Sequence, residues 1–284
     1  MKVPTPSGTP TRGDEIHREP GFSYLPRFLS VDEAETLGAF FAGLRPLWEK
    51  RHTDEAPGRR GASGRLTRPV YWLGAWQFAA LGYYAEPDHI DHKCVRAEPL
   101  PQVMVDILER LRPELALHGD DGPLPSTCLI NYYGSEPKQG RAPPLDYARL
   151  RMHRDAEPGA VVMLSVGQPA QFEFLEPGAA EPAHAQWVRN RSVVIISGPH
   201  FKDRLYHRVT RVRYGEEPAL SSRLEGFDVR RVSVSFRHVP ERHIQDLDDL
   251  DSDARAIVQP YVEQLAEHSE HFRCQIAGLI PDRE

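Results

Sequence analysis

Cysteine is scarce in this sequence. Its three cysteines, Cys94, Cys128 and Cys274, lie far apart and form no C-x-x-C pair. This spacing excludes a small fold held together by disulfides and gives no sign of a cysteine zinc or redox site, so we expect three reduced thiols. Long apolar runs are also absent, because no stretch approaches about 18 apolar residues, and the Pro- and Thr-rich start has no apolar signal core. We therefore expect a cytoplasmic monomer with no membrane partner.

The composition is that of a folded protein. The 284 residues include 40% hydrophobic and 27% charged residues, a balance typical of globular chains. This length allows one large domain or two small ones.

The net charge of −6 is unevenly distributed. Residues 241–284 contain 11 acidic and 4 basic residues, whereas the preceding 240 residues contain 30 acidic and 31 basic ones. Two stretches, 45–70 and 189–213, are locally basic. They are either contacts for phosphates or an ordinary solvated face.

The apolar pattern predicts helices first and strands later. Ser30 and Glu33 form a capping-box pattern before a helical apolar stripe, and a second stripe follows Pro99. From about residue 126 the pattern changes to short β-rich runs at 127–133, 160–166, 171–175, 185–189, 192–197, 205–209 and 229–237. No helical period separates these runs, so we expect a mainly β sandwich or jelly roll with flanking helices (α+β). Residues 1–19 read as a flexible lead-in, and 241–284 as an acidic, helical C-terminal extension.

His153 and Asp155 are separated by one residue. On a strand, this spacing directs both side chains to one face. His207 is a third candidate, in the strand-like run LYHRV. Two histidines and one carboxylate form the facial triad of non-haem Fe(II) oxygenases. The pattern H-x-D is weak evidence alone, since His89 and Asp91 repeat it in a polar run that we interpret as a surface loop.

The run 230–237 places two arginines on one face of a strand. Arg231, Ser233, Ser235 and Arg237 alternate with apolar residues. Two guanidinium groups on one face can bind the two carboxylates of a dianionic acid. The alternative is that both arginines lie on a solvated face of the sheet.

Together, C-L-I-N-x-Y at 128–133, H-x-D, the distal His207 and R-x-x-x-x-x-R at 231–237 resemble the AlkB family of Fe(II)- and 2-oxoglutarate-dependent dioxygenases. The resemblance spans about 20–240 and implies one domain there, a double-stranded β-helix supported by N-terminal helices. It also implies Fe(II), 2-oxoglutarate and O2 as cofactors. His153, Asp155 and His207 would bind the metal. The residues implied to bind 2-oxoglutarate are Asn131, Tyr133, Arg231, Ser233 and Arg237, with Arg231 on its distal carboxylate.

The resemblance also suggests substrate residues. Trp76 and Tyr83 look like the aromatic pair of a nucleotide-recognition lid, on which an extruded base stacks. The alternative is that this aromatic run is core or a sheet edge. Glu157 stands where DNA-repair members place an acid near the target base, and an exposed turn carboxylate is the alternative. These residues imply oxidative demethylation of alkylated bases in single-stranded DNA or RNA.

The sequence departs from the family in four places, one of which is Arg191-Ser192, where the bacterial repair enzymes often have Gly-Asp. The segment 134–152 is longer than in the bacterial repair enzymes, which implies an enlarged lip beside the site. Ser233 replaces a common Asn, and the acidic extension lies outside the family core. These departures keep two other hypotheses open. One is a hydroxylase or demethylase of a protein side chain or small metabolite, and the other is a non-catalytic nucleic-acid binding module.

Overall fold

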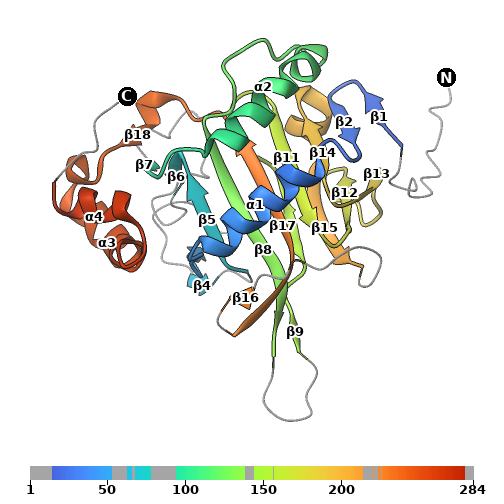
Figure 1. Cartoon of the computed structure of the whole chain (residues 1–284). Coiled ribbons are helices and arrows are strands. Elements are labelled where there is room, and N and C mark those ends of the chain that lie inside the picture. Colours follow the sequence, from blue (N-terminus) through green and yellow to red (C-terminus); the bar gives the residue numbers. More distant parts are fainter. Residues whose placement is uncertain are drawn as a thin grey trace.

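The computed structural model describes residues 15–52, 63–65, 68–77, 94–137, 144–155, 157–213, 220, 223–224 and 226–278. Figure 1 shows a strand-rich body with two helices lying across one face and a helical pair at one side. Among the described residues, no helix has both the length and the apolar character that a membrane span requires.

The elements follow the predicted order of helices before most strands. The helices are α1 (Val31–Gly43), α2 (Gln102–Leu117), α3 (Ser252–Ala266) and α4 (Glu270–Ile276), with the short helical turns η3 (Gly198–Arg204), η4 (Glu241–His243) and η5 (Leu247–Asp249). The strands before α2 are β1 (His17–Glu19), β2 (Phe22–Leu25), β3 (Lys50–His52), β4 (Ser63–Arg65), β5 (Val70–Leu73), β6 (Ala75–Gln77) and β7 (Cys94–Arg96). The strands after α2 are β8 (Thr127–Glu136), β9 (Leu145–Asp146), β10 (Leu150–His153), β11 (Val161–Gly167), β12 (Ala170–Leu175), β13 (His184–Val188), β14 (Ser192–Ile196), β15 (Tyr206–Val212), β16 (Arg223–Leu224), β17 (Phe227–Arg237) and β18 (Ile244–Gln245). Each of the seven predicted β-rich runs therefore corresponds to an observed strand.

The larger of the two main sheets supports the helices. Its central path runs β1-β2-β14-β11-β17-β8-β5, and the short strands β16 and β9 pair with β17 and β8. Helices α1 and α2 cover its outer face, where Leu37, Phe41 and Met104 share a core with Leu164 and Val234 of the sheet. The capping box at Ser30 and Glu33 is present and starts α1 as predicted.

The smaller main sheet, β10-β15-β12-β13, faces the inner side of the larger one. Val161 and Met163 of β11 pack there against Phe172 of β12 and Val209 of β15. Successive side chains of β11 and β17 point to opposite faces of the sheet. One face of each strand therefore packs against the helices, and the other faces the space between the sheets. This double-layered arrangement confirms the predicted jelly-roll fold.

The first strands differ from the sequence prediction. Residues 17–19 are not a flexible lead-in: they form β1, which pairs with β2 through a tight turn at Pro20 and Gly21. Gly21 has φ +84°, and a Cβ there would lie 2.6 Å from the carbonyl oxygen of Ser197. The backbone pairing, rather than any apolar pattern in β1, orders this segment.

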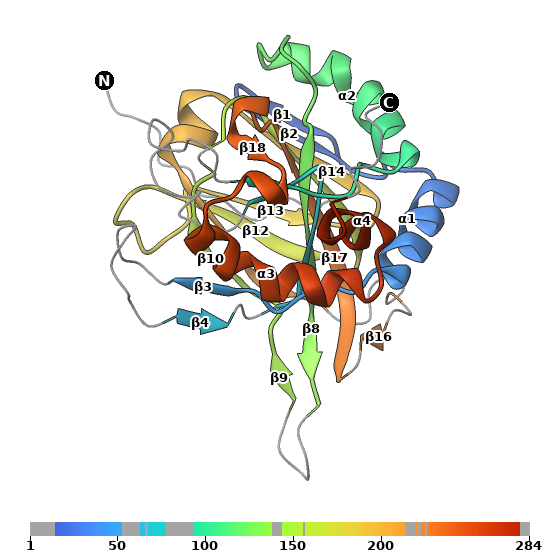
Figure 2. The ribbon, with the colours of Figure 1, turned by 90° about the vertical axis from the view of Figure 1, so that its left-hand side faces the viewer.

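The C-terminal extension packs onto the domain. Val258, Val262 and Phe272 of α3 and α4 are buried in the same core as Trp76 and Val95. Arg96 of β7 binds both Asp246 and Glu241 at the start of the extension. Figure 2 shows α3 and α4 lying together as one helical pair. The extension is therefore helical, as predicted, and its apolar side completes the core.

The segment 134–152 contains the end of β8, strand β9 and the return to β10. In Figure 1 the β8–β9 hairpin projects from one end of the large sheet. Ser135 pairs with Asp228, whereas Arg237 lies at the other end of β17 opposite Thr127. At about 3.3 Å per residue, these ends are roughly 30 Å apart. The described part of the segment thus starts next to Tyr133, at the end of β17 far from Arg237, and returns through β10 to His153.

Candidate active site

The three predicted metal ligands come together between the sheets. His153 at the end of β10 pairs with His207 of β15, and their ring centroids are 4.2 Å apart. Asp155 follows β10, and its Oδ2 lies 3.4 Å from His207 Nε2. One ligand atom from each of the three residues lies within 4.8 Å of the others. The spacing H-x-D and the pairing of β10 with β15 create this cluster.

Arg237 holds the carboxylate of Asp155. Its Nε and Nη2 donate to Asp155 Oδ1 at 2.9 and 2.6 Å, so Oδ2 is the oxygen that faces His207. Burial raises the pKa of Asp155, but Arg237 and then the two histidines lower it more, and the net pKa is well below its usual range. Asp155 is therefore an anion at neutral pH.

The two histidines are neutral at neutral pH. Burial lowers the pKa of His153, and burial with the neighbouring His153 lowers the pKa of His207 to about 3. His153 Nδ1 lies 2.9 Å from the carbonyl oxygen of Arg151, which leaves its Nε2 for a ligand. Two neutral imidazoles and one carboxylate anion fit a divalent metal such as Fe(II).

The residues expected to bind 2-oxoglutarate share the inner face of β8 and β17. Arg231 pairs with Tyr133 and Ser233 with Asn131 across the two strands. All four are buried. Arg231 Nη2 donates to Ser165 Oγ at 2.7 Å, and Nη1 lies 3.3 Å from the carbonyl oxygens of Gln168 and Val188. The alternation in 231–237 therefore places both arginines between the sheets, and the solvated-face alternative is excluded.

Arg68 is a residue of this face that the motifs did not identify. It is buried, its Nε donates to Asn131 Oδ1 at 2.7 Å, and its guanidinium lies 5.5 Å from the ring centroid of Tyr133. Its charge also contributes to the lowered pKa of His153. The sequence places Arg68 only in a basic stretch, and no local spacing distinguishes it from the other basic residues there.

A sequence profile of the 2OG-Fe(II) oxygenase superfamily matches residues 21–237. The chain belongs to this superfamily. It is a 2-oxoglutarate- and Fe(II)-dependent dioxygenase, and its cofactors are Fe(II), 2-oxoglutarate and O2. A comparison with curated protein sequences finds no match.

Two solved structures are similar to this oxygenase. OsALKBH1 is 19% identical with a TM-score of 0.52, and the match covers 79% of this chain and 100% of that one. An oxidoreductase of the 2OG-Fe(II) oxygenase family from Burkholderia pseudomallei is 17% identical with a TM-score of 0.43, and the match covers 78% and 88% of the two chains. The fold shared with OsALKBH1 agrees with the resemblance to the AlkB family.

Glu157 lies beside the metal cluster and is not an exposed turn residue. Its side chain is fully buried, and Oε1 lies 3.4 Å from Arg237 Nε. Neither carboxylate oxygen makes a hydrogen bond with the residues that the structure describes. Burial raises the pKa of Glu157, with Arg237 acting in the opposite direction. Buried Lys202 of η3 donates to the backbone carbonyl of Glu157 and holds this segment in place.

Of the two residues of the predicted aromatic lid, the structure describes only Trp76, and Trp76 lies in the core. Trp76 of β6 is 1% exposed, packs against Tyr261 and Phe272, and donates from Nε1 to Glu49. This position agrees with the alternative that the aromatic run is core, so Trp76 is not part of the substrate site proposed below. Tyr83 lies outside the described residues, as do His89 and Asp91.

Much of the basic stretch 189–213 is engaged within the oxygenase. Arg204 pairs with Glu176, and Arg208 with Glu173, both at 2.8 Å. Arg213 lies 4.1 Å from the ring centroid of Trp187. These contacts favour the alternative of an ordinary protein face over a set of phosphate contacts.

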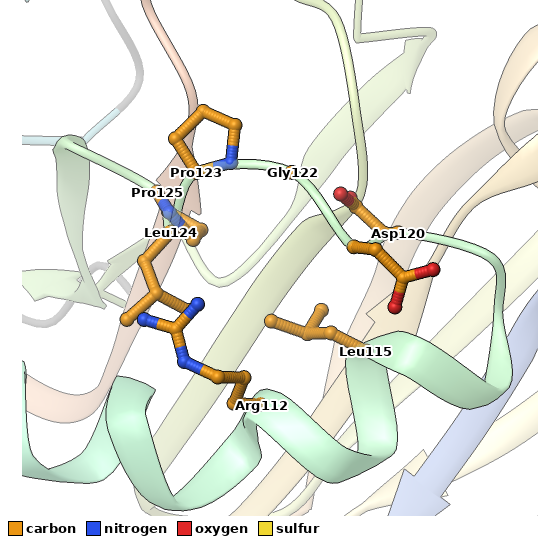
Figure 3. Close-up of a pocket in the computed structure, with 8 residues that line it drawn as sticks. Arg112, Leu115, Asp120, Gly122, Pro123, Leu124 and Pro125 are labelled. Carbon is orange, nitrogen blue, oxygen red and sulfur yellow. The ribbon is translucent and has the colours of Figure 1, made fainter.

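A separate hollow lies between the end of α2 and the loop before β8 (Figure 3). Its volume is about 100 Å³, and its lining includes Arg112, Leu115, Asp120 and Leu124. Ligand sites for small molecules usually measure roughly 300 to 1,000 Å³. Since this hollow is smaller and contains none of the metal-cluster residues, it is not a candidate for the active site.

Proposed function

We propose that this oxygenase removes methyl groups from nitrogen atoms of nucleobases in single-stranded DNA or RNA. The observation that carries this proposal is Glu157, a buried carboxylate beside the His153, Asp155 and His207 cluster. The resemblance to the AlkB family supports the same substrate class.

His153, Asp155 and His207 would bind Fe(II) on one side and leave its other positions open. The bound iron, with 2-oxoglutarate and O2, supplies oxidation of a substrate C–H bond while 2-oxoglutarate becomes succinate and CO2. Arg237 orients Asp155 by holding Oδ1, so that Oδ2, which faces His207, would be the oxygen that binds the metal.

Arg231 would bind the distal carboxylate of 2-oxoglutarate, because it is the buried cation farthest along β17 from Arg237 on the same face. Asn131, Tyr133 and Ser233 would complete the surroundings of the cosubstrate. Arg68, which holds Asn131, would fix the orientation of that amide.

Glu157 suits the chemistry of a methylated base. 1-Methyladenine and 3-methylcytosine carry a positive charge and an exocyclic amino group, which offers N–H donors. A buried carboxylate whose oxygens make no hydrogen bond with the described residues would accept from that amino group. Glu157 would thereby place the N-methyl carbon near the metal and favour the cationic base over an unmodified one.

The test is to measure formaldehyde and succinate together. Iron-loaded protein is supplied with 2-oxoglutarate and single-stranded DNA containing 1-methyladenine or 3-methylcytosine, and unmethylated DNA is the blank. We expect one formaldehyde per additional succinate. Glu157→Gln should lower kcat/KM for the methylated strand roughly tenfold or more, because a hydrogen bond to a charged group is worth about 1.5 to 3 kcal/mol.

Glu176→Gln is the matched control, because Glu176 is a carboxylate that pairs with Arg204 on the outside. It should leave kcat/KM unchanged. If succinate forms but methylated DNA and RNA yield no formaldehyde, the nucleobase assignment is wrong, and the substrate is a protein side chain or a metabolite.

A further inference from the structure

A second group of metal-binding side chains lies away from the His153, Asp155 and His207 cluster. His17 and Glu19 of β1 and His184 of β13 place one ligand atom each within 4.8 Å of one another. In Figure 1, β1 and β13 lie on the same side of the molecule. β1 is the edge of the large sheet and β13 is the edge of the small one, so the group joins the two layers.

The strand geometry brings this group together. His17 and Glu19 are two residues apart, so both point to one face of β1, and Arg18 points to the other face, where it binds Glu114 of α2 at 2.7 Å. This is the same spacing of histidine and carboxylate that His153 and Asp155 show.

The two distances from Glu19 to the histidines match a single bound ion. Glu19 Oε1 lies 3.2 Å from His184 Nδ1 and 3.5 Å from His17 Nε2. Metal bonds of about 2.0 to 2.2 Å at tetrahedral angles place two ligand atoms about 3.3 to 3.6 Å apart. The other ring nitrogens, His17 Nδ1 and His184 Nε2, have no hydrogen-bond partner among the described residues.

Aromatic packing holds the rings in place. Phe22 contacts both histidine rings, with centroids 5.4 Å from His17 and 4.7 Å from His184, and Phe174 and Phe201 also pack on His184. The aromatic packing therefore fixes the positions of the two imidazole rings, and one nitrogen of each ring has no hydrogen-bond partner among the described residues. The three side chains are 16% to 37% exposed, so an ion and a water molecule can reach the group from solvent.

We propose that His17, Glu19 and His184 bind one Zn(II) ion, with water as the fourth ligand, and that this ion fastens β1 to β13. Two imidazoles and one glutamate form a ligand set that zinc uses in proteins. The ion would hold the first strand against the small sheet. The proposal concerns the ligands of a second site and does not rest on the proposed function.

The experiment measures zinc stoichiometry in the full-length chain after removal of metals by a chelator. The double variant His153→Ala/Asp155→Ala lacks two ligands of the first cluster. Zinc that this variant binds therefore reports on His17, Glu19 and His184 alone. After Zn(II) is added back and the excess is removed by desalting, we expect this variant to retain one equivalent of Zn(II). It should also unfold at a higher temperature with Zn(II) than without it, since a ligand of the native state stabilises that state.

Adding His184→Gln to that variant should weaken zinc binding at least tenfold and abolish the thermal shift. His17→Gln and Glu19→Gln, on the edge strand β1, should weaken zinc binding in the same way. They test the proposal independently if a variant of the partly buried His184 does not fold. His200→Gln is the matched control, because His200 is an exposed histidine that packs beside the same Phe201. It should leave zinc binding unchanged.

Two results would overturn the proposal. One is a double variant that retains no zinc, which would show that the three side chains form only an ion pair. The other is zinc binding that persists undiminished when His17, Glu19 and His184 are replaced together.

Discussion

At the scale of single residues, the two oxygens of Asp155 have different neighbours. Arg237 donates twice to Oδ1, whereas Oδ2 faces His207. A carboxylate that is fixed through one oxygen presents the other in a defined direction, and such supporting contacts typically change metal affinity by about 10- to 100-fold. Arg237 is thus expected to act on the metal through Asp155.

Arg237→Met should lower Fe(II) or Mn(II) affinity by about 10- to 100-fold at neutral pH. Because Arg237 lowers the pKa of Asp155, its removal raises that pKa, and metal binding should begin to fail at a higher pH as the solution is acidified. Metal titrations across pH measure both effects. Arg230→Met, on the same strand but bound to Ser135, is the control. An affinity and pH profile equal to those of the parent would contradict the positioning role.

Arg231→Ala should raise the KM for 2-oxoglutarate roughly tenfold or more, because it removes a charge-assisted pair worth about 1.5 to 3 kcal/mol. Initial rates of succinate formation at varied 2-oxoglutarate concentration give this value. An unchanged KM in folded Arg231→Ala protein would show that another group binds the distal carboxylate.

Sequence analysis identified site residues that belong to a motif of fixed spacing. It missed site residues that lie far from these motifs in the sequence. His153, Asp155 and His207 follow from H-x-D and a strand-borne histidine. Arg68 lies just before β5 and is 63 residues from its partner Asn131 in the sequence, and no local pattern records such a contact. For Trp76, the aromatic pattern fitted both a lid and a core, and only the packing of α4 distinguishes the two.

At the scale of elements, β17 was predictable and β1 was not. Residues 231–237 of β17 alternate between polar and apolar side chains, which is a strong signal. β1 has three polar residues and is ordered by its pairing with β2, so its pattern resembles a flexible segment. Short edge strands depend on the partner strand and the turn, which a periodicity argument does not detect.

The start of α1 provides a test of local structure. Glu33 N donates to Ser30 Oγ at 3.1 Å, and Ser30 N donates to Glu33 Oε2 at 2.8 Å. Ser30→Ala should lower the free energy of unfolding by about 0.5 to 2 kcal/mol. Chemical denaturation measures this change, and a loss below about 0.3 kcal/mol would contradict the capping role.

The same cap has a defined pH dependence. The hydrogen bond from Arg110 is the main reason why the pKa of Glu33 is lowered, with Ser30 also contributing. A lowered carboxyl pKa stabilises the native state fully above the unfolded value of about 4.3, and this stabilisation is lost as the pH falls through the lower folded pKa. The decrease in the free energy of unfolding caused by Ser30→Ala should therefore be smaller at acid pH than at pH 7.

At the scale of the whole molecule, the acidic extension is part of the domain core. Phe272 is fully buried against Trp76, so Phe272→Ala should lower the free energy of unfolding by about 3 to 5 kcal/mol. His268→Ala, at an exposed position between α3 and α4, should change it by less than about 0.5 kcal/mol. Equal, small losses in both variants would show that the extension does not stabilise the domain.

We propose that His153, Asp155 and His207 form the iron centre at which 2-oxoglutarate is consumed. The most direct test is succinate formation by iron-loaded parent protein and Asp155→Ala under O2, with saturating 2-oxoglutarate and equal protein. We predict steady succinate formation by the parent and less than about one hundredth of that rate in the variant, since loss of a ligand removes both metal affinity and the open facial geometry. Succinate formation at the parent rate by folded Asp155→Ala protein would contradict the claim.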